Sequence, residues 1–300
     1  MSNETIRAPR LREGGTIGIC SPSHIAAREG YAPTLDVIRG MGYRVREAEH
    51  LYAATDGYLA APGERAADFM QLILDPEVDM LLFGGGEGAN ELLPLLDFEA
   101  IRRHPKLICS YSDATWLLDP IWAKTGLECY YGLSLRTFPE GGAYEWEHFR
   151  RHLVLGDAAE HLPSGPWQIL MPGMAEGIVV GGYLRNFALL LGSPYFPWNP
   201  DEKHLLCVED HEVFGGVDYV SAMLSHIEQS PFMATVTGVL FGHYSAQPHP
   251  HLLSRLRRLG ERWSIPVAYC DDFGHGERQA ILPIGRRAAL DTAANTIHYL

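Results

Sequence analysis

The chain has 300 residues, of which 46% are hydrophobic and 20% are charged, and its formal net charge at pH 7 is −13. This composition is typical of a globular protein with room for one large domain or two smaller ones. The negative charge disfavours nucleic acid as a partner. No apolar run reaches the roughly 18 residues that a membrane-spanning helix needs. Five cysteines without CxxC spacing and a polar N-terminus without an apolar signal core predict a cytoplasmic protein.

Strands and helices alternate through the first half of the chain. Short apolar strands are expected over residues 16–20, 43–45, 78–83 and 107–109. The clearest helical pattern covers 62–74, and further helices should begin near Asn90 and after Ser112, where Pro120 should kink or shorten the helix. This alternation predicts a parallel sheet with right-handed crossovers.

Proline and glycine punctuate residues 156–174, which show no lasting period and are expected to form a linker or lid. Beyond it, strands are expected over 177–182, 205–208, 235–241, 266–270, 280–283 and 287–291, with helices over 185–191, 217–227 and 252–259. We therefore expect an α/β protein with two domains, an N-terminal parallel-sheet domain over 1–160 and a smaller, mixed β/α domain over 161–300.

Ser112 follows the buried strand at 107–109 and precedes a helical pattern that begins at Trp116. A serine at a sharp strand-to-helix turn is lifted out of the sheet, and the helix N-terminus adds positive potential there. The Gly-x-Ser-x-Gly signature is absent, because Ser110 and Ala114 occupy the glycine positions. The same residues also fit ordinary helix capping, so the motif alone leaves both a nucleophile and a cap open.

A glycine cluster, Gly84-Gly85-Gly86-Glu87-Gly88, follows the strand at 78–83 directly. It is neither GxGxxG nor a Walker loop, although glycine-rich turns of this kind often bind phosphate. Alternatively, its bare backbone approaches a reacting carbonyl and donates N–H groups, or it is a tight turn and nothing more. Both this cluster and Ser112 would lie at the carboxyl ends of strands, where open α/β sheets place their ligand sites.

An acid and a histidine in the second half complete a candidate constellation. Glu209 ends the strand at 205–208, and either a solvated cap or a buried orienting acid fits that position. His275 lies between two glycines, which leave room for a substrate beside the ring. A serine needs a base such as histidine, and that base needs an orienting carboxylate, so Ser112, Glu209 and His275 are the candidate triad. The other histidine cluster, at 243, 249 and 251, is interrupted by prolines and lacks a fixed acidic ligand, so we expect no metal site.

Matching segments then connect the chain to a known family. The most specific is Tyr-Ser-Asp-Ala-Thr at 111–115, and the others are 15–23, 85–86, 92–97, 181–182, 192–195, 208–210, 274–276 and 282–285. On these segments the chain resembles the LD-carboxypeptidase family of serine peptidases, which includes the microcin C immunity proteins.

The resemblance implies a Ser–His–Glu triad in which Ser112 is the nucleophile, His275 the general base and Glu209 the orienting acid. It implies that Asp113 and Gly86 supply oxyanion N–H groups. It also implies a Rossmann- or flavodoxin-like first domain, a site at the interface of the two domains, and a homodimer. Further substrate contacts are expected at Gly85, Glu87 and Trp167, and we expect no cofactor.

The activity expected on this basis is hydrolysis of a terminal amide bond through an acyl-enzyme. The substrate is either a murein tetrapeptide, cleaved at its L-to-D bond, or a peptidyl or aminoacyl nucleotide. Tyr183 and Arg185 depart from the family's Gly-Gly-Asn-Leu segment, and only Trp167 is available to stack on a nucleotide base, so the substrate stays open. A substrate carboxylate would need a basic partner, and the sequence does not choose among Arg136, Arg185 and Arg278.

Two other functions are considered. A homologue that keeps the fold and pocket but only binds a small ligand is compatible with Ser110 and Pro120 near the turn. A cysteine enzyme using Cys109 is disfavoured, because that residue belongs to the buried strand and not to the tip of the turn.

Overall fold

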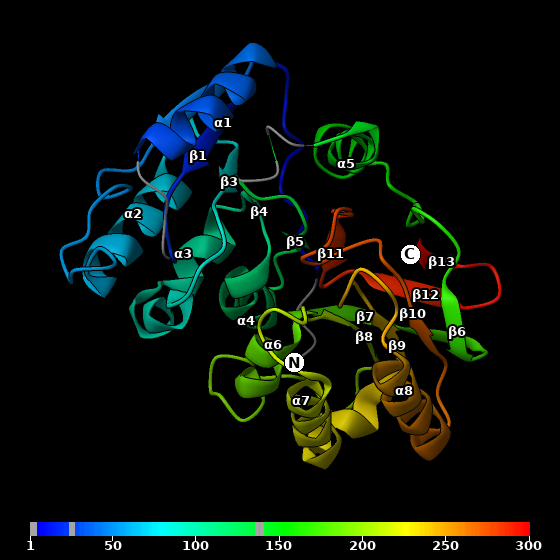
Figure 1. The fold of residues 1–300 in the computed structure, drawn as a ribbon. Helices are drawn as coiled ribbons and strands as arrows, with labels where there is room; N and C mark the ends of the chain where they lie inside the picture. The colour runs from blue at the N-terminus through cyan, green and yellow to red at the C-terminus, as the bar shows by residue number, and fades with distance from the viewer. Residues whose placement is uncertain (1–4, 24–27, 136–137, 139–140) are drawn as a thin grey trace.

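The computed structural model describes residues 5–23, 28–135, 138 and 141–300, and two β-sheets organise this part of the chain (Figure 1). The first sheet has the order β11-β5-β4-β3-β1-β2, formed by Leu282–Ile284, Cys129–Tyr131, Leu107–Ser110, Met80–Leu82, Thr16–Ile19 and Arg44–Glu47. The second has the order β13-β12-β7-β8-β9-β10-β6, formed by Thr296–Tyr299, Arg287–Asp291, Met174–Tyr183, His204–Glu209, Val236–Phe241, Val267–Tyr269 and Gln168–Met171. The predicted α/β class is confirmed.

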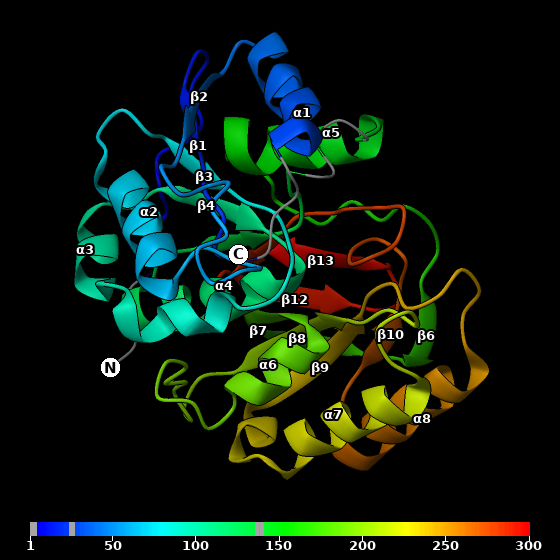
Figure 2. The same ribbon diagram turned by 60° about the vertical axis from the view of Figure 1, so that its left-hand side comes forward.

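Helices cover both faces of the first sheet, whose strands β1 to β5 are parallel. One face carries α1 (Arg28–Gly40) and α5 (Ala143–Phe149), and the other carries α2 (Pro62–Leu74), α3 (Phe98–Arg103) and α4 (Thr115–Thr125) (Figure 2). Helix α2 has the predicted bounds, and its buried Phe69, Leu72 and Ile73 lie on the stripe that its periodicity indicates.

One local expectation needs correction. The helix expected from about Asn90 is a 3₁₀ helix over Ala89–Leu95, in which Pro94 lacks the N–H that an α-helical bond to Asn90 would require. Helix α4 contains Pro120 and ends at Thr125, before Gly126, where φ is 80°.

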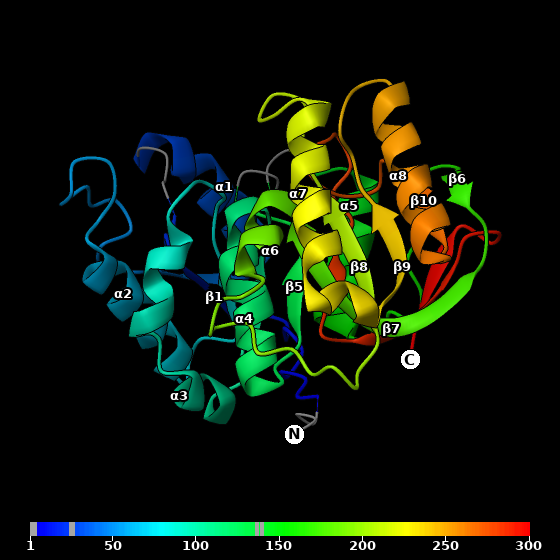
Figure 3. The same ribbon diagram turned by 90° about the horizontal axis from the view of Figure 1, so that it is seen from below.

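The second sheet has a parallel centre, β7 to β10, with antiparallel strands at both edges. Helices α6 (Leu184–Leu190), α7 (Val217–Gln229) and α8 (Pro250–Trp263) follow these strands, and α7 and α8 lie side by side in Figure 3. The segment 156–174, expected as an irregular linker or lid, contains β6, which pairs antiparallel with β10. Hydrogen bonding to that edge makes the end of the segment part of the sheet.

The two sheets share one continuous core, because buried side chains of α2 and α4 belong to the same apolar cluster as those of α6, α7 and α8. After β10 the chain returns to the first sheet, where β11 pairs antiparallel with β5. Next to this return, Arg286 donates to both carboxylate oxygens of the buried Glu128, at 2.8 and 2.6 Å. This ion pair connects the turn after β11 to the residue that precedes β5.

Candidate active site

Ser112 occupies a strained turn between β4 and α4. Its φ is 59°, in the left-handed region, and the only other described residues besides glycines with positive φ are Ser264 and Asn295. Such strain costs about 1–3 kcal/mol and persists where the surroundings hold it, often at functional sites. Ser110, which stands where a glycine is usual, donates from Oγ to the Phe83 carbonyl at 2.8 Å and ties the ends of β4 and β3 together.

The structure brings Ser112, His275 and Glu209 together, although 163 positions separate the serine from the histidine. Ser112 Oγ lies 2.9 Å from His275 Nε2, and His275 Nδ1 lies 2.9 Å from Glu209 Oε2. Glu209 is wholly buried, so it holds the Nδ1 proton and leaves Nε2 to accept the proton of Ser112. The three groups thus form a directed chain from carboxylate to hydroxyl.

Tyr131 supports both ends of this chain. Its hydroxyl donates to Glu209 Oε1 at 2.5 Å and accepts the backbone N–H of Ser112 at 3.0 Å. Tyr131 is buried in β5, and its neighbour in the register is Ser110 of β4. It therefore occupies the second oxygen of the acid and holds the turn in place.

The glycine cluster lies against the serine. A Cβ atom at Gly85 would be 3.2 Å from Ser112 Cβ, and Gly86 has a φ of 151°, so the cluster approaches the hydroxyl with bare backbone. Asp113 follows Ser112 directly. Its carboxylate accepts from Ser23 Oγ at 2.6 Å, Ala89 N at 2.8 Å and Asn186 Nδ2 at 3.1 Å.

The side chain of Asp113 therefore anchors the turn, while its backbone N–H stays a candidate oxyanion donor with that of Gly86. Burial raises the pKa of the Asp113 carboxyl, against the hydrogen bonds from Ser23 and Ala89. The anchor joins the turn to the loop after β1, to the 3₁₀ helix and to α6.

Close contact between the two sheets positions the acid. Thr115 Oγ1 of α4 accepts the backbone N–H of Tyr183 at 2.9 Å, and Asp119 Oδ1 accepts that of Gly181 at 3.0 Å. A Cβ atom at Gly182 would lie 2.6 Å from Thr115 Oγ1, so only glycine permits this approach. Since Tyr183 pairs with Glu209 across β7 and β8, the contact sets the place of the acid.

Aromatic rings surround His275 on several sides. The ring centroids of Phe214, Tyr111 and Tyr183 lie 4.9, 5.0 and 5.3 Å from its own. Phe214 is 54% exposed, which is unusual for so large an apolar side chain beside a buried acid. These rings restrict water around the imidazole, and low polarity strengthens the bonds within the triad.

A buried carboxyl, Asp210, lies next to the triad acid in sequence. Its Oδ1 accepts the backbone N–H of His211 at 2.7 Å, and its Oδ2 has no hydrogen-bond partner. Burial, which outweighs that hydrogen bond, raises the pKa of Asp210 to about 7.

Trp167 packs inside the protein. It is 6% exposed, its ring lies 5.9 Å from that of His161, and its Nε1 donates to Asp272 Oδ2 at 2.7 Å. Its indole nitrogen is therefore hydrogen-bonded within the protein, and its ring packs near His161. This packing is the alternative to stacking on a ligand. Asp272 also accepts from His161 Nε2 and from Ser164.

The structure also bears on Cys109, on metal binding and on membrane-spanning helices. Burial raises the pKa of the Cys109 thiol to about 12, which disfavours it as a nucleophile. Within the described residues, no group of three His, Cys, Asp or Glu side chains could hold a metal ion. Across the same residues, every helix is too short or too polar to cross a membrane.

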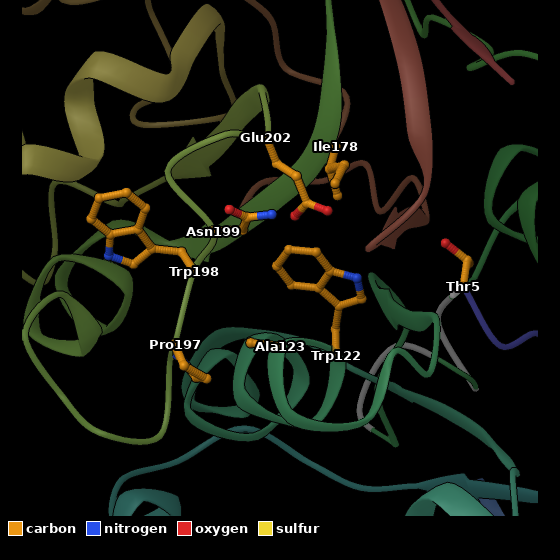
Figure 4. Close-up of a pocket in the computed structure, with 8 residues that line it drawn as sticks. All are labelled: Thr5, Trp122, Ala123, Ile178, Pro197, Trp198, Asn199 and Glu202. Atoms are coloured by element: carbon orange, nitrogen blue, oxygen red, sulfur yellow. The ribbon is translucent and has the colours of Figure 1, made fainter. Parts of the chain in front are cut away.

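A pocket lies on another part of the interface between the sheets (Figure 4). Trp122 of α4, Ile178 of β7 and residues of the segment between α6 and β8 line it, and Glu202 and Asn199 extend toward the Trp122 ring. No residue of the triad lines this pocket.

Sequence reasoning missed the supporting residues. Tyr131 was not predicted as a site residue, and nothing in the sequence connects its hydroxyl to both Ser112 and Glu209. Its pairing with Ser110 across β4 and β5 is known only from the structure. Ser23 and Asn186 carry no signal in the sequence either.

The fold and this constellation define a class, a two-sheet α/β protein with a serine, histidine and acid at the carboxyl ends of its parallel strands. Family profiles agree with it. The LD-carboxypeptidase N-terminal domain matches residues 17–132, and the LD-carboxypeptidase C-terminal domain matches residues 176–290. The chain belongs to the LD-carboxypeptidase family, a family of serine-type carboxypeptidases, which supports a role as a peptidase or amide hydrolase.

Individual relatives match over nearly the whole chain. "Putative carboxypeptidase SCO6489" of Streptomyces coelicolor is 32% identical, with 98% of this chain and 96% of that protein covered. The microcin C7 self-immunity protein MccF of Escherichia coli is 27% identical over 97% of this chain and 94% of its own. The crystal structure of an MccF-like protein from Bacillus anthracis is 26% identical, covers 99% of both chains and superposes with a TM-score of 0.88. A structure of MccF, 25% identical with a TM-score of 0.85 and 97% of both chains covered, is a complex with aspartyl sulfamoyl adenosine.

Proposed function

We propose that this protein is a serine carboxypeptidase or amidase that hydrolyses a terminal amide bond through an acyl-enzyme on Ser112. The observation that carries the proposal is the position of His275, which is 2.9 Å from both the Ser112 hydroxyl and the Glu209 carboxylate. A histidine in that position can take the serine proton as a base and return it as an acid.

In the first step, Ser112 Oγ attacks the carbonyl carbon of the substrate while His275 Nε2 takes its proton. Buried Glu209 stabilises the imidazolium that forms. The carbonyl oxygen becomes an anion, and the backbone N–H groups of Gly86 and Asp113 are the proposed donors to it. A donor of this kind typically contributes about 10²–10³ in rate.

In the second step, His275 gives its proton to the nitrogen of the scissile amide, and the amine leaves. Water then attacks the ester on Ser112, with His275 again the base, and the acid product is released. The Ser112 backbone N–H already donates to Tyr131, so it is not assigned to the oxyanion. Instead, that bond keeps the strained serine conformation ready for attack.

Two substrates are in view, because the LD-carboxypeptidase name implies an L-to-D peptide bond and MccF binds an aminoacyl sulfamoyl nucleoside. The test is hydrolysis by the purified protein of a murein tetrapeptide ending in D-alanine and, in parallel, of an aminoacyl sulfamoyl adenosine. We expect release of D-alanine or of the nucleoside, and loss of that release in Ser112→Ala. Turnover by Ser112→Ala equal to that of the wild type would overturn the proposal.

The homodimer implied by the resemblance stays a prediction. Light scattering on the eluting peak of a size-exclusion column checks it, because a dimer has twice the 33.4 kDa mass of one chain.

A further inference from the structure

An ion pair connects the two sheets beside the triad. Arg185 Nη2 lies 2.5 Å from Glu87 Oε1. Glu87 belongs to the glycine cluster that follows β3, and Arg185 lies in the first turn of α6, directly after β7. The side chain of Glu87 is 74% exposed, whereas that of Arg185 is only 27% exposed. The arginine is therefore held in the protein, while its partner stands in solvent.

Both ends of this pair are adjacent to reacting groups. The Arg185 guanidinium lies 5.4 Å from the centroid of the Tyr183 ring, and that ring lies 5.3 Å from His275. On the other side, a Cβ atom at Gly85, two residues before Glu87, would lie 3.2 Å from Ser112 Cβ. The pair consequently flanks the space in front of the serine and histidine.

The charges around this space are mostly negative. Glu209 of the triad and its neighbours Asp210 and Asp113 are buried carboxyl groups, and the whole chain carries a net charge of −13. Arg278, one of the other arginines considered for a substrate carboxylate, lies 5.8 Å from the Tyr144 ring, next to α5. Arg136 is outside the described residues. Arg185 thus supplies positive charge where an anionic substrate would otherwise be repelled.

We propose that Arg185 binds the free carboxylate of the residue that leaves, and that Glu87 is an internal carboxylate which this group displaces. The inference rests on the proposed function and specifies its substrate class, a peptide whose leaving residue carries a free carboxylate. That carboxylate is within about 4 Å of the scissile carbonyl carbon, so its binding group must flank the nucleophile.

Displacement of Glu87 is energetically inexpensive. An exposed ion pair contributes little to stability, and the released glutamate returns to water. Arg185 donates to Glu87 through Nη2, and its planar guanidinium can donate two parallel hydrogen bonds to a substrate carboxylate. Until substrate arrives, Glu87 holds Arg185 in the extended position that the substrate will use.

The test uses two N-acylated dipeptides that differ only at the end, one with a terminal carboxylate and one with a terminal carboxamide. We expect the wild type to favour the carboxylate by about 10- to 100-fold in kcat/KM, the range of a charge-assisted hydrogen bond. Arg185→Gln should abolish this preference, mainly through KM. Glu87→Gln should increase it a few-fold, because the competing carboxylate is gone. Arg278→Gln, an exposed arginine three residues after His275, is the matched control and should keep the wild-type preference.

A second readout separates this inference from the proposed function. Labelling of Ser112 by a fluorophosphonate reports the nucleophile without any peptide, and each peptide is also scored by how well it protects Ser112 from the label. If the wild type is labelled on Ser112 but cleaves both peptides equally, or is protected equally by both, the role of Arg185 is overturned and the peptidase proposal stands. The same holds if Arg185→Gln loses the same factor in kcat/KM for both peptides. A wild type with no label on Ser112 overturns the proposed function itself.

Discussion

The loop after β10 takes part in two acid–histidine pairs with opposite surroundings. His275 is 11% exposed, and it joins buried Glu209 to the Ser112 hydroxyl. Three residues earlier, Asp272 accepts from His161, and both of these side chains are sealed from solvent at 1% and 0% exposure.

A serine is present at the second pair as well, but the order of the groups differs. Ser164 Oγ donates to Asp272 Oδ1 at 2.7 Å, and no contact connects it to the imidazole, whose Nδ1 has no partner. Asp272 is the centre of that cluster, whereas the histidine is the centre of the first. A serine, a histidine and an acid in proximity are therefore insufficient, because only a central histidine can move a proton from the hydroxyl.

The largest effect is expected from breaking the pair of Glu209 and His275. In Glu209→Gln, an amide NH₂ can face His275 Nδ1, which favours the tautomer that protonates Nε2 and blocks acceptance from Ser112. We expect kcat to fall by about 10³–10⁴-fold with a small change in melting temperature. Steady-state kinetics and calorimetry on the same preparation check this, and a fall of less than tenfold would contradict the role of Glu209.

Breaking the second pair should have the reverse effect. Asp272→Asn removes the charge that accepts from His161, Ser164 and Trp167, and loss of one partner of a buried pair costs about 3 kcal/mol. Urea unfolding should show that loss, while kcat per titrated active site stays within about threefold of wild type. A large fall in kcat at unchanged stability would show that the cluster takes part in catalysis.

These contrasts also show what the sequence could and could not reveal. The strands ending at Ser112 and Glu209 were readable from apolar runs, because parallel strands bury both faces. The directed bonds of Tyr131 and Asp272 were not, since they depend on how two sheets meet and leave no spacing in the chain. The bond from the Trp167 indole nitrogen to Asp272 has no signal in the sequence either.

Acid should first destabilise the buried cluster around Asp272 and His161. The ring of His148 lies 5.5 Å from that of His161, and burial lowers the pKa of His148 to about 3. Burial also lowers the pKa of the neighbouring His152 well below its usual value. Because the folded pKa is depressed below the ordinary value of about 6.5, the stabilising contribution is full above pH 6.5 and is lost as the pH falls toward 3. We expect the melting temperature to fall over that window and the fall to be smaller in His148→Gln. Parallel curves for the two proteins would contradict this.

The smallest effect is expected at Asp210, next to the pair of Glu209 and His275. The folded pKa of Asp210 is raised to about 7, so its contribution is fully present below about pH 4 and is lost as the pH rises through 7. Asp210→Asn keeps the acceptor for the His211 N–H and removes the charge. The variant should melt above the wild type at pH 8, with the difference shrinking below pH 4. An equal or lower melting temperature at pH 8 would contradict the burial of a charge there.

The most direct test of the whole account is to find which serine becomes acylated. The purified protein is treated with a fluorophosphonate, digested, and the adduct is located by mass spectrometry, with Ser112→Ala and Ser164→Ala in parallel. We expect one adduct, on Ser112, that persists in Ser164→Ala and disappears in Ser112→Ala. An adduct on Ser164, or an unmodified Ser112 in the folded wild-type protein, would contradict the central claim that the histidine-centred cluster is the catalytic one.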